Sequence, residues 1–90
     1  MSREQLTAAS DHLESAAADA TSDDARDRLT ELAGQLDSLA SRAQKPDHGR
    51  LARIESALDE IQAGENDAVA ATIEDALDDI HAFRETLEGV

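Results

Sequence analysis

The chain of 90 residues contains no cysteine, tryptophan or tyrosine, and it has one proline, one phenylalanine and a single lysine, Lys45. Without cysteine, a disulfide framework, a thiolate metal site and thiol catalysis are excluded. No stretch approaches the roughly 20 apolar residues that a membrane span needs. The opening MSREQLTAAS lacks the basic segment followed by an apolar run that a signal peptide has. We therefore expect a cytoplasmic protein that does not bind a membrane.

The scarcity of aromatic residues also argues against nucleic-acid binding, because almost nothing is present to stack on bases. The formal net charge of −13 has the wrong sign for binding phosphates. The sequence contains neither a glycine-rich phosphate loop nor a calcium loop of the EF-hand kind. We expect no cofactor and no enzymatic activity.

What the chain does contain is acidic residues, 21 of them against eight basic ones. Such a charge repels itself at low ionic strength, whereas molar salt shortens the Debye length to about 3 Å. Acidic excess, little lysine, much alanine and few large apolar residues together predict a halophilic protein. An acidic mesophilic helical protein is the alternative. Carboxylate pairs such as Asp23–Asp24 and Asp78–Asp79 are expected to attract hydrated cations without specificity.

Large apolar side chains are few, because half of the apolar residues are alanine. Ten leucines, four isoleucines, two valines, one methionine and one phenylalanine supply the rest. Full burial of one such side chain contributes roughly 1.5–3 kcal/mol, while conformational entropy opposes folding along the whole chain. A core this thin favours pairing with a second copy, so we expect a homo-oligomer, most simply a dimer.

Four segments place apolar residues at alternating spacings of three and four, which is typical of helices in a left-handed bundle. They run over residues 6–20, 25–43, 51–61 and 69–87. Thr21 or Ser22 is expected to cap the second helix, and Asn66 or Asp67 the fourth. Gly64 is expected to end the third. The first and third helices should be shorter than the second and fourth.

The fold prediction is an all-α, antiparallel four-helix bundle, because short connections favour antiparallel neighbours. It forms one domain over residues 1–90, built from two αα-hairpins of about residues 2–45 and 47–89. Alanine at many apolar positions of the first helix should let it approach its neighbours closely. A dimer of opened hairpins is the main alternative.

One basic stretch interrupts the acidic chain. Arg42, Lys45, His48, Arg50 and Arg53 lie in and around QKPDHGRLARI, where the single proline ends the second helix. A structural interpretation makes these residues the hinge between the hairpins. A functional interpretation makes them a docking site for an anionic partner or for the acidic end of another copy. This acidic end is expected at the opposite end of the bundle and carries Asp19, Asp23, Asp24, Glu65 and Asp67.

Two further sets of residues are candidates for function. Leu77, Ile80, Phe83 and Leu87 on the fourth helix are candidates for the core or for an apolar interface, with Leu77 and Phe83 as exposed anchors. Asp78, His81 and Glu85 share a helix face and can begin a metal site, although di-iron bundles need more ligands than this. A partly exposed, solvated His81 is the simpler interpretation.

Two runs, PDHGRLARIESALDEI at residues 46–61 and DALDDIHAFRETLEGV at residues 75–90, resemble a family of small acidic proteins from haloarchaea that has no assigned biochemical role. The resemblance implies a helical domain in a high-salt cytoplasm and supplies no active-site residues.

Three functional hypotheses follow from these patterns. The first is a non-enzymatic interaction or structural module of a halophilic cytoplasm that associates with itself or with a protein partner. The second is a small regulatory protein that docks an anionic partner through the basic stretch. The third is a cation- or metal-binding bundle.

Overall fold

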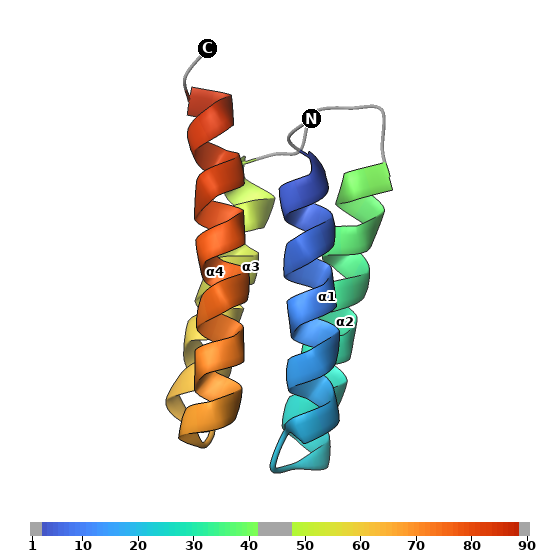
Figure 1. Cartoon of the computed structure of the whole chain (residues 1–90), viewed down its shortest axis with the longest axis vertical. Helices are drawn as coiled ribbons and strands as arrows, with labels where there is room; N and C mark the ends of the chain where they lie inside the picture. The colour runs from blue at the N-terminus through green and yellow to red at the C-terminus, as the bar shows by residue number, and fades with distance from the viewer. Residues whose placement is uncertain (1–2, 42–47, 89–90) are drawn as a thin grey trace.

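The computed structural model of the chain describes residues 3–41 and 48–88, with side chains as far as Thr86. These residues form four α-helices and no strand, which confirms the all-α prediction: α1 (Arg3–Asp19), α2 (Asp23–Ser41), α3 (His48–Ala63) and α4 (Asp67–Glu88) (Figure 1). The predicted alternation in length is also confirmed, since α1 and α3 have 17 and 16 residues and α2 and α4 have 19 and 22. Within the described ranges, none of the helices combines the length and the apolarity that crossing a bilayer requires.

Side-chain caps define where α2 and α4 begin. Ser22 Oγ accepts a hydrogen bond from the Ala25 amide at 3.1 Å, and Asn66 Oδ1 accepts one from the Val69 amide at 2.9 Å. Each satisfies a backbone donor that the first helical turn leaves without a partner. Of the two alternatives at each position, the structure therefore selects Ser22 and Asn66.

The third helix ends as predicted next to Gly64, but not through a left-handed glycine. Gly64 N donates to Ile61 O at 3.1 Å, and Glu65 N donates to Gln62 O at 3.3 Å. No glycine of the described ranges has a positive φ. The last turn is tightened by i→i−3 bonds instead, which satisfies carbonyls that the helix end would otherwise leave free.

A single apolar core runs along the bundle, and each helix contributes residues at the spacings predicted from the sequence. Its largest fully buried side chains are Leu6, Leu13, Leu29, Leu36, Leu51, Ile54, Leu58, Ile73, Ile80 and Val69. Because this stripe is narrow, the molecule is long and thin, with principal extents of 39 × 19 × 19 Å.

The first helix packs most extensively of the four, against both α2 and α4. Ala9, Ala16 and Ala17 of α1 are buried, and such small side chains allow neighbouring backbones to approach closely. Ser10 is also buried, and its Oγ donates to the carbonyl of Ala33 on α2 at 2.8 Å. The predicted close approach of the alanine-rich helix is therefore confirmed.

The third helix packs less extensively. It contacts α4 less than α1 does, and it contacts α2 only slightly. Its buried positions are all large residues, Leu51, Ile54, Leu58 and Ile61, which hold the helix axis farther from its neighbours. The bundle therefore has one sparsely packed side, between α2 and α3.

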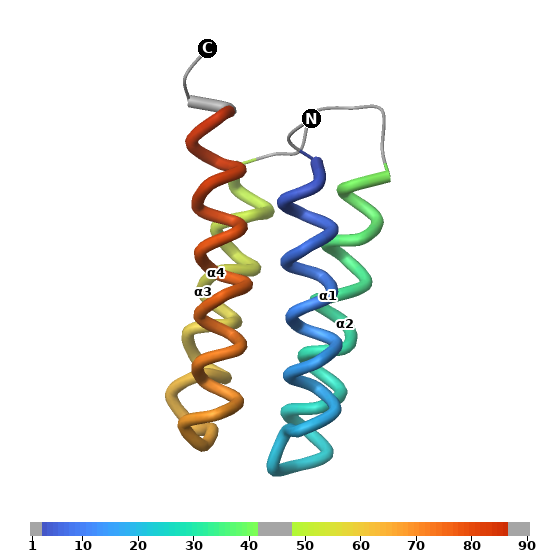
Figure 2. Tube along the Cα trace, in the orientation of Figure 1, coloured from blue at the N-terminus to red at the C-terminus, as the bar shows by residue number. Residues whose placement is uncertain are grey.

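Successive helices point in opposite directions. In Figures 1 and 2 the chain runs down α1 and α3 and up α2 and α4.

Candidate functional site

The predicted basic docking residues fall at the start of α3 or outside the described ranges. Arg42 and Lys45 lie outside the described residues. His48 and Arg50 are half-buried, whereas Arg53 is exposed. Arg50 is engaged in an interaction, while Arg53 makes no hydrogen bond or ion pair within residues 3–41 and 48–86. Of this set, the described part of the chain therefore offers Arg53 to an incoming partner.

His48 takes part in a polar cluster that joins α3 to α4, made of His48, Glu55, His81 and Arg84. Arg84 Nε donates to His48 Nδ1 at 3.2 Å, and Arg84 Nη1 donates to Glu55 Oε1 at 2.6 Å. The first bond requires His48 Nδ1 to be an unprotonated acceptor. His48 therefore serves the packing of α3 on α4, which agrees with the structural interpretation of this residue.

Glu55 is more enclosed than Arg84 and His81 of this α3–α4 polar cluster, with 13% of its side chain exposed. Its Oε2 lies 3.1 Å from His81 Nε2, close enough for an ion pair when the ring is protonated, but the two atoms do not have hydrogen-bond geometry. The carboxylate therefore depends chiefly on Arg84, because a half-buried charge without a partner is costly.

This arrangement also bears on the metal hypothesis. His81 approaches Glu55 of the neighbouring helix rather than forming a ligand set with Asp78 and Glu85. Among residues 3–41 and 48–88, no group of three or more histidine, aspartate or glutamate side chains is arranged to hold a metal ion. The guanidinium of Arg84 lies at the same carboxylate and would repel a cation there.

A second histidine joins α1 to α4. His12 Nδ1 lies 2.9 Å from Asp79 Oδ2, and the two side chains are 39% and 27% exposed. The contact acts as a hydrogen bond or as an ion pair depending on the proton of the ring. Both groups join α1 to α4 at the edge of their packing, so we assign them a structural role.

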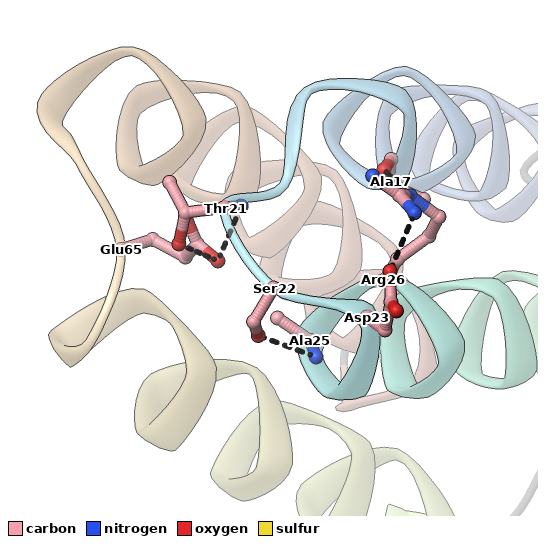
Figure 3. A network of polar contacts seen from close by, with 7 residues as sticks. All are labelled: Ala17, Thr21, Ser22, Asp23, Ala25, Arg26 and Glu65. Carbon is pink, nitrogen blue, oxygen red and sulfur yellow. Dashed lines mark hydrogen bonds and ion pairs between the residues drawn. The ribbon is translucent and has the colours of Figure 1, made fainter.

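The acidic end of the bundle holds a third polar network, drawn in Figure 3. Glu65, from the connection between α3 and α4, accepts hydrogen bonds from the amide and the hydroxyl of Thr21, from the connection between α1 and α2. Nearby, Arg26 pairs with Asp23 at 2.9 Å and donates to Ala17 O at 3.3 Å. The two turns therefore lie side by side, held by exposed polar contacts.

The expectation of exposed apolar anchors on α4 is wrong for Leu77 and Phe83. Leu77 is 4% exposed, Phe83 2% and Ile80 0%, so all three belong to the core of the single chain. They are covered because α4 packs against α1 on one side and α3 on the other. The side chain of Leu87 lies outside the described residues.

The exposed side of α3 is the best candidate for an interaction surface. Ala52, Arg53, Ser56, Ala57 and Glu60 line a shallow, mainly apolar depression there, which we call the α3 outer face. A second shallow depression lies on α1 and is lined by Arg3, Glu4, Thr7, Ala8 and Asp11. Both are too open to enclose a small molecule, so the α3 outer face suits a flat contact with a protein surface.

A model of DUF7553, a family of unknown function, matches residues 1–86. The chain belongs to this family. The match takes in α1, α2, α3 and nearly all of α4, so the polar clusters and the α3 outer face all lie within the DUF7553 domain. No curated protein and no solved structure shows significant similarity to this DUF7553 chain.

Membership of DUF7553 confirms that the chain belongs to a family without an assigned role, as the sequence resemblance implied. The haloarchaeal part of that resemblance stays a prediction. The sequence had also not singled out Glu55 and Arg84 of this DUF7553 chain. Glu55 follows the core residue Ile54, and Arg84 follows the core residue Phe83. This position beside the apolar stripe is the sequence feature that could have indicated their contact.

Proposed function

We propose that the chain is a non-enzymatic, all-α interaction module that associates with itself in the cytoplasm of a salt-accumulating cell. The observation that carries the proposal is the uneven packing of the bundle. The third helix contacts α2 only slightly, and its outer face is a shallow, mainly apolar depression. A second copy docked on the α3 outer face would bury additional apolar surface, which the thin core of a single chain does not provide.

The proposal includes the division of the bundle into two αα-hairpins, over about residues 2–45 and 47–89. The opposite directions of successive helices in Figure 1 support this division. Polar contacts support it too, since the buried Ser10–Ala33 bond lies between α1 and α2, and the Glu55–Arg84 pair lies between α3 and α4. The Arg28–Glu60 pair, which joins the two proposed hairpins, is more exposed than the Glu55–Arg84 pair.

A high-salt setting is supported by where the carboxylates lie. The described acidic side chains are exposed except for three half-buried ones, Glu55, Asp79 and Glu65. Each of these three has a partner: Arg84, His12 and Thr21, respectively. Exposed carboxylates hold water and hydrated cations, and concentrated salt screens their mutual repulsion.

Light scattering in molar potassium chloride tests self-association. We expect the mass of a dimer at high protein concentration and a shift toward the monomer on dilution. At low ionic strength the dimer should weaken, because two copies of net charge −13 repel each other. A monomer mass at every concentration in molar salt would overturn the proposal.

Regulatory docking of an anionic partner is the second candidate, and the exposure of Arg53 favours it. A glutamate-rich peptide is a suitable probe, and its binding can be followed by fluorescence anisotropy. Replacing Lys45 and Arg53 with glutamate should abolish binding and leave helicity unchanged. Equal binding of the peptide by the double variant would contradict this candidate.

A further inference from the structure

The α3 outer face has a charge pattern that is complementary to itself. Arg53, Ser56, Ala57 and Glu60 are spaced at i, i+3, i+4 and i+7, so they lie along one side of α3. The basic end of this row is Arg53 and the acidic end is Glu60. Between them are two small side chains, which permit another helix to approach closely.

Two antiparallel copies of such a row match each other about a two-fold axis. In an isologous contact, residue i of one copy faces residue j of the other, and j faces i. Positions 53 and 60 lie equally far in sequence from the midpoint between Ser56 and Ala57. An axis through that midpoint therefore brings Arg53 of each copy beside Glu60 of the other, and it brings Ser56 beside Ala57.

The charged side chains at both ends of the row are accessible for pairing with another copy. Arg53 is exposed and makes no ion pair within the described ranges. Glu60 is 74% exposed and touches Arg28 of α2 at 3.2 Å. Because that pair is open to solvent, the Glu60 carboxylate can accept a second cation without giving up Arg28.

Charge distribution also favours α3 over the other helices as the meeting point. The third helix has two arginines and three acidic residues, whereas α4 has one arginine and seven acidic residues. The balance is one basic to four acidic residues on α1, and two to five on α2. Two copies that meet through α3 therefore bring together the least negative parts of the molecule, where repulsion is smallest.

We propose that a second copy of this chain docks on the α3 outer face in antiparallel orientation, with Arg53 of each copy paired with Glu60 of the other. The inference rests on the proposed self-association and adds the surface, the orientation and the pairing that specify it. The two small residues at the centre set the close approach, and the two charge pairs at the ends set the register.

Charge reversal and mixing test this geometry. The Arg53→Glu variant places two glutamates at each end of the contact, and the Glu60→Arg variant places two arginines there. Each variant alone should dimerise severalfold more weakly than the wild type in molar potassium chloride, because two attractive pairs become repulsive and charges in direct contact are only partly screened by salt. An equimolar mixture should recover dimer formation, since both pairs are complementary in the heterodimer. Sedimentation equilibrium measures association, and circular dichroism checks folding.

The outcomes separate this inference from the proposed function. Weak association of each variant alone with recovery in the mixture supports the α3 contact. Dimers of unchanged strength in both variants overturn the α3 contact and leave self-association standing. A wild type that stays monomeric overturns both. Folded variants that fail to recover in the mixture overturn the antiparallel pairing.

Discussion

Arg84 and Glu55 form the shortest side-chain pair between α4 and α3, with Arg84 Nη1 donating to Glu55 Oε1 at 2.6 Å. The two side chains are 26% and 13% exposed, so the pair is shielded from solvent more than the other ion pairs of the described chain. Because α3 contacts α2 only slightly, this pair and the apolar residues beside it hold α3 in place.

Removing the guanidinium should therefore destabilise the fold. We expect Arg84→Met to lower the free energy of unfolding by roughly 1–3 kcal/mol, because it leaves the enclosed Glu55 carboxylate without its partner. The Glu55→Gln/Arg84→Met double variant should lose less than the two single changes added together. Urea unfolding at constant molar salt gives these differences.

Arg28→Met is the matched control, because it breaks the Arg28–Glu60 pair, whose side chains are 41% and 74% exposed. An exposed pair of this kind contributes about 0–1 kcal/mol. Equal losses for Arg84→Met and Arg28→Met would show that the α3–α4 pair has no special role.

The close packing of α1 makes a second prediction. Ala16 is 1% exposed on the helix that packs against both α2 and α4. Ala16→Leu should cost roughly 1–3 kcal/mol, because extra methylene groups in a filled core force the helices apart. Ala18→Leu, at an exposed position of α1, should change stability by less than about 0.5 kcal/mol. Thermal unfolding of the two variants measures these changes in stability. An Ala16→Leu variant as stable as the wild type would contradict the close packing.

The cap of α4 makes a third prediction. Asn66→Ala should destabilise the protein by about 1 kcal/mol, since the Val69 amide loses the acceptor that lies 2.9 Å away. Asn66→Ser keeps an acceptor at this position and should retain most of the stability. Both are measured by denaturant unfolding, and equal stability of the alanine and serine variants would argue against the cap.

Salt dependence follows from the surface carboxylates. Helicity measured by circular dichroism should fall as potassium chloride is diluted from molar to millimolar concentrations, because the acidic groups then repel each other. Asp75→Asn/Asp78→Asn removes two exposed charges from α4 and should lower the salt concentration needed for folding. Unchanged helicity of the wild type in dilute buffer would falsify the halophilic proposal.

The sequence predicted the helices and the core well, because both depend on local periodicity. The 3/4 spacing of apolar residues places Leu13, Leu36 and Leu58 in the core, and the structure buries each of them. Caps were predictable to within one residue, since Ser22 and Asn66 are each flanked by a residue that also suits the position.

Contacts between helices were less predictable. Whether a residue beside the apolar stripe is enclosed depends on how near the adjacent helix lies, which one sequence does not reveal. Glu55 is enclosed because Arg84 and His81 reach it from α4. For the same reason Leu77 and Phe83 were wrongly expected to be exposed, as the sequence could not show that two helices cover α4.

Cross-linking through a single introduced cysteine tests the central claim, self-association through the α3 outer face, most directly. The natural chain has no cysteine, so a Ser56→Cys variant carries one thiol at the centre of the proposed contact. The control is Ser15→Cys, which places the thiol at an exposed position of α1. In molar salt, a short thiol-specific cross-linker should convert Ser56→Cys to a covalent dimer and leave Ser15→Cys monomeric. Equal cross-linking of the two variants, or none in either, would contradict the account.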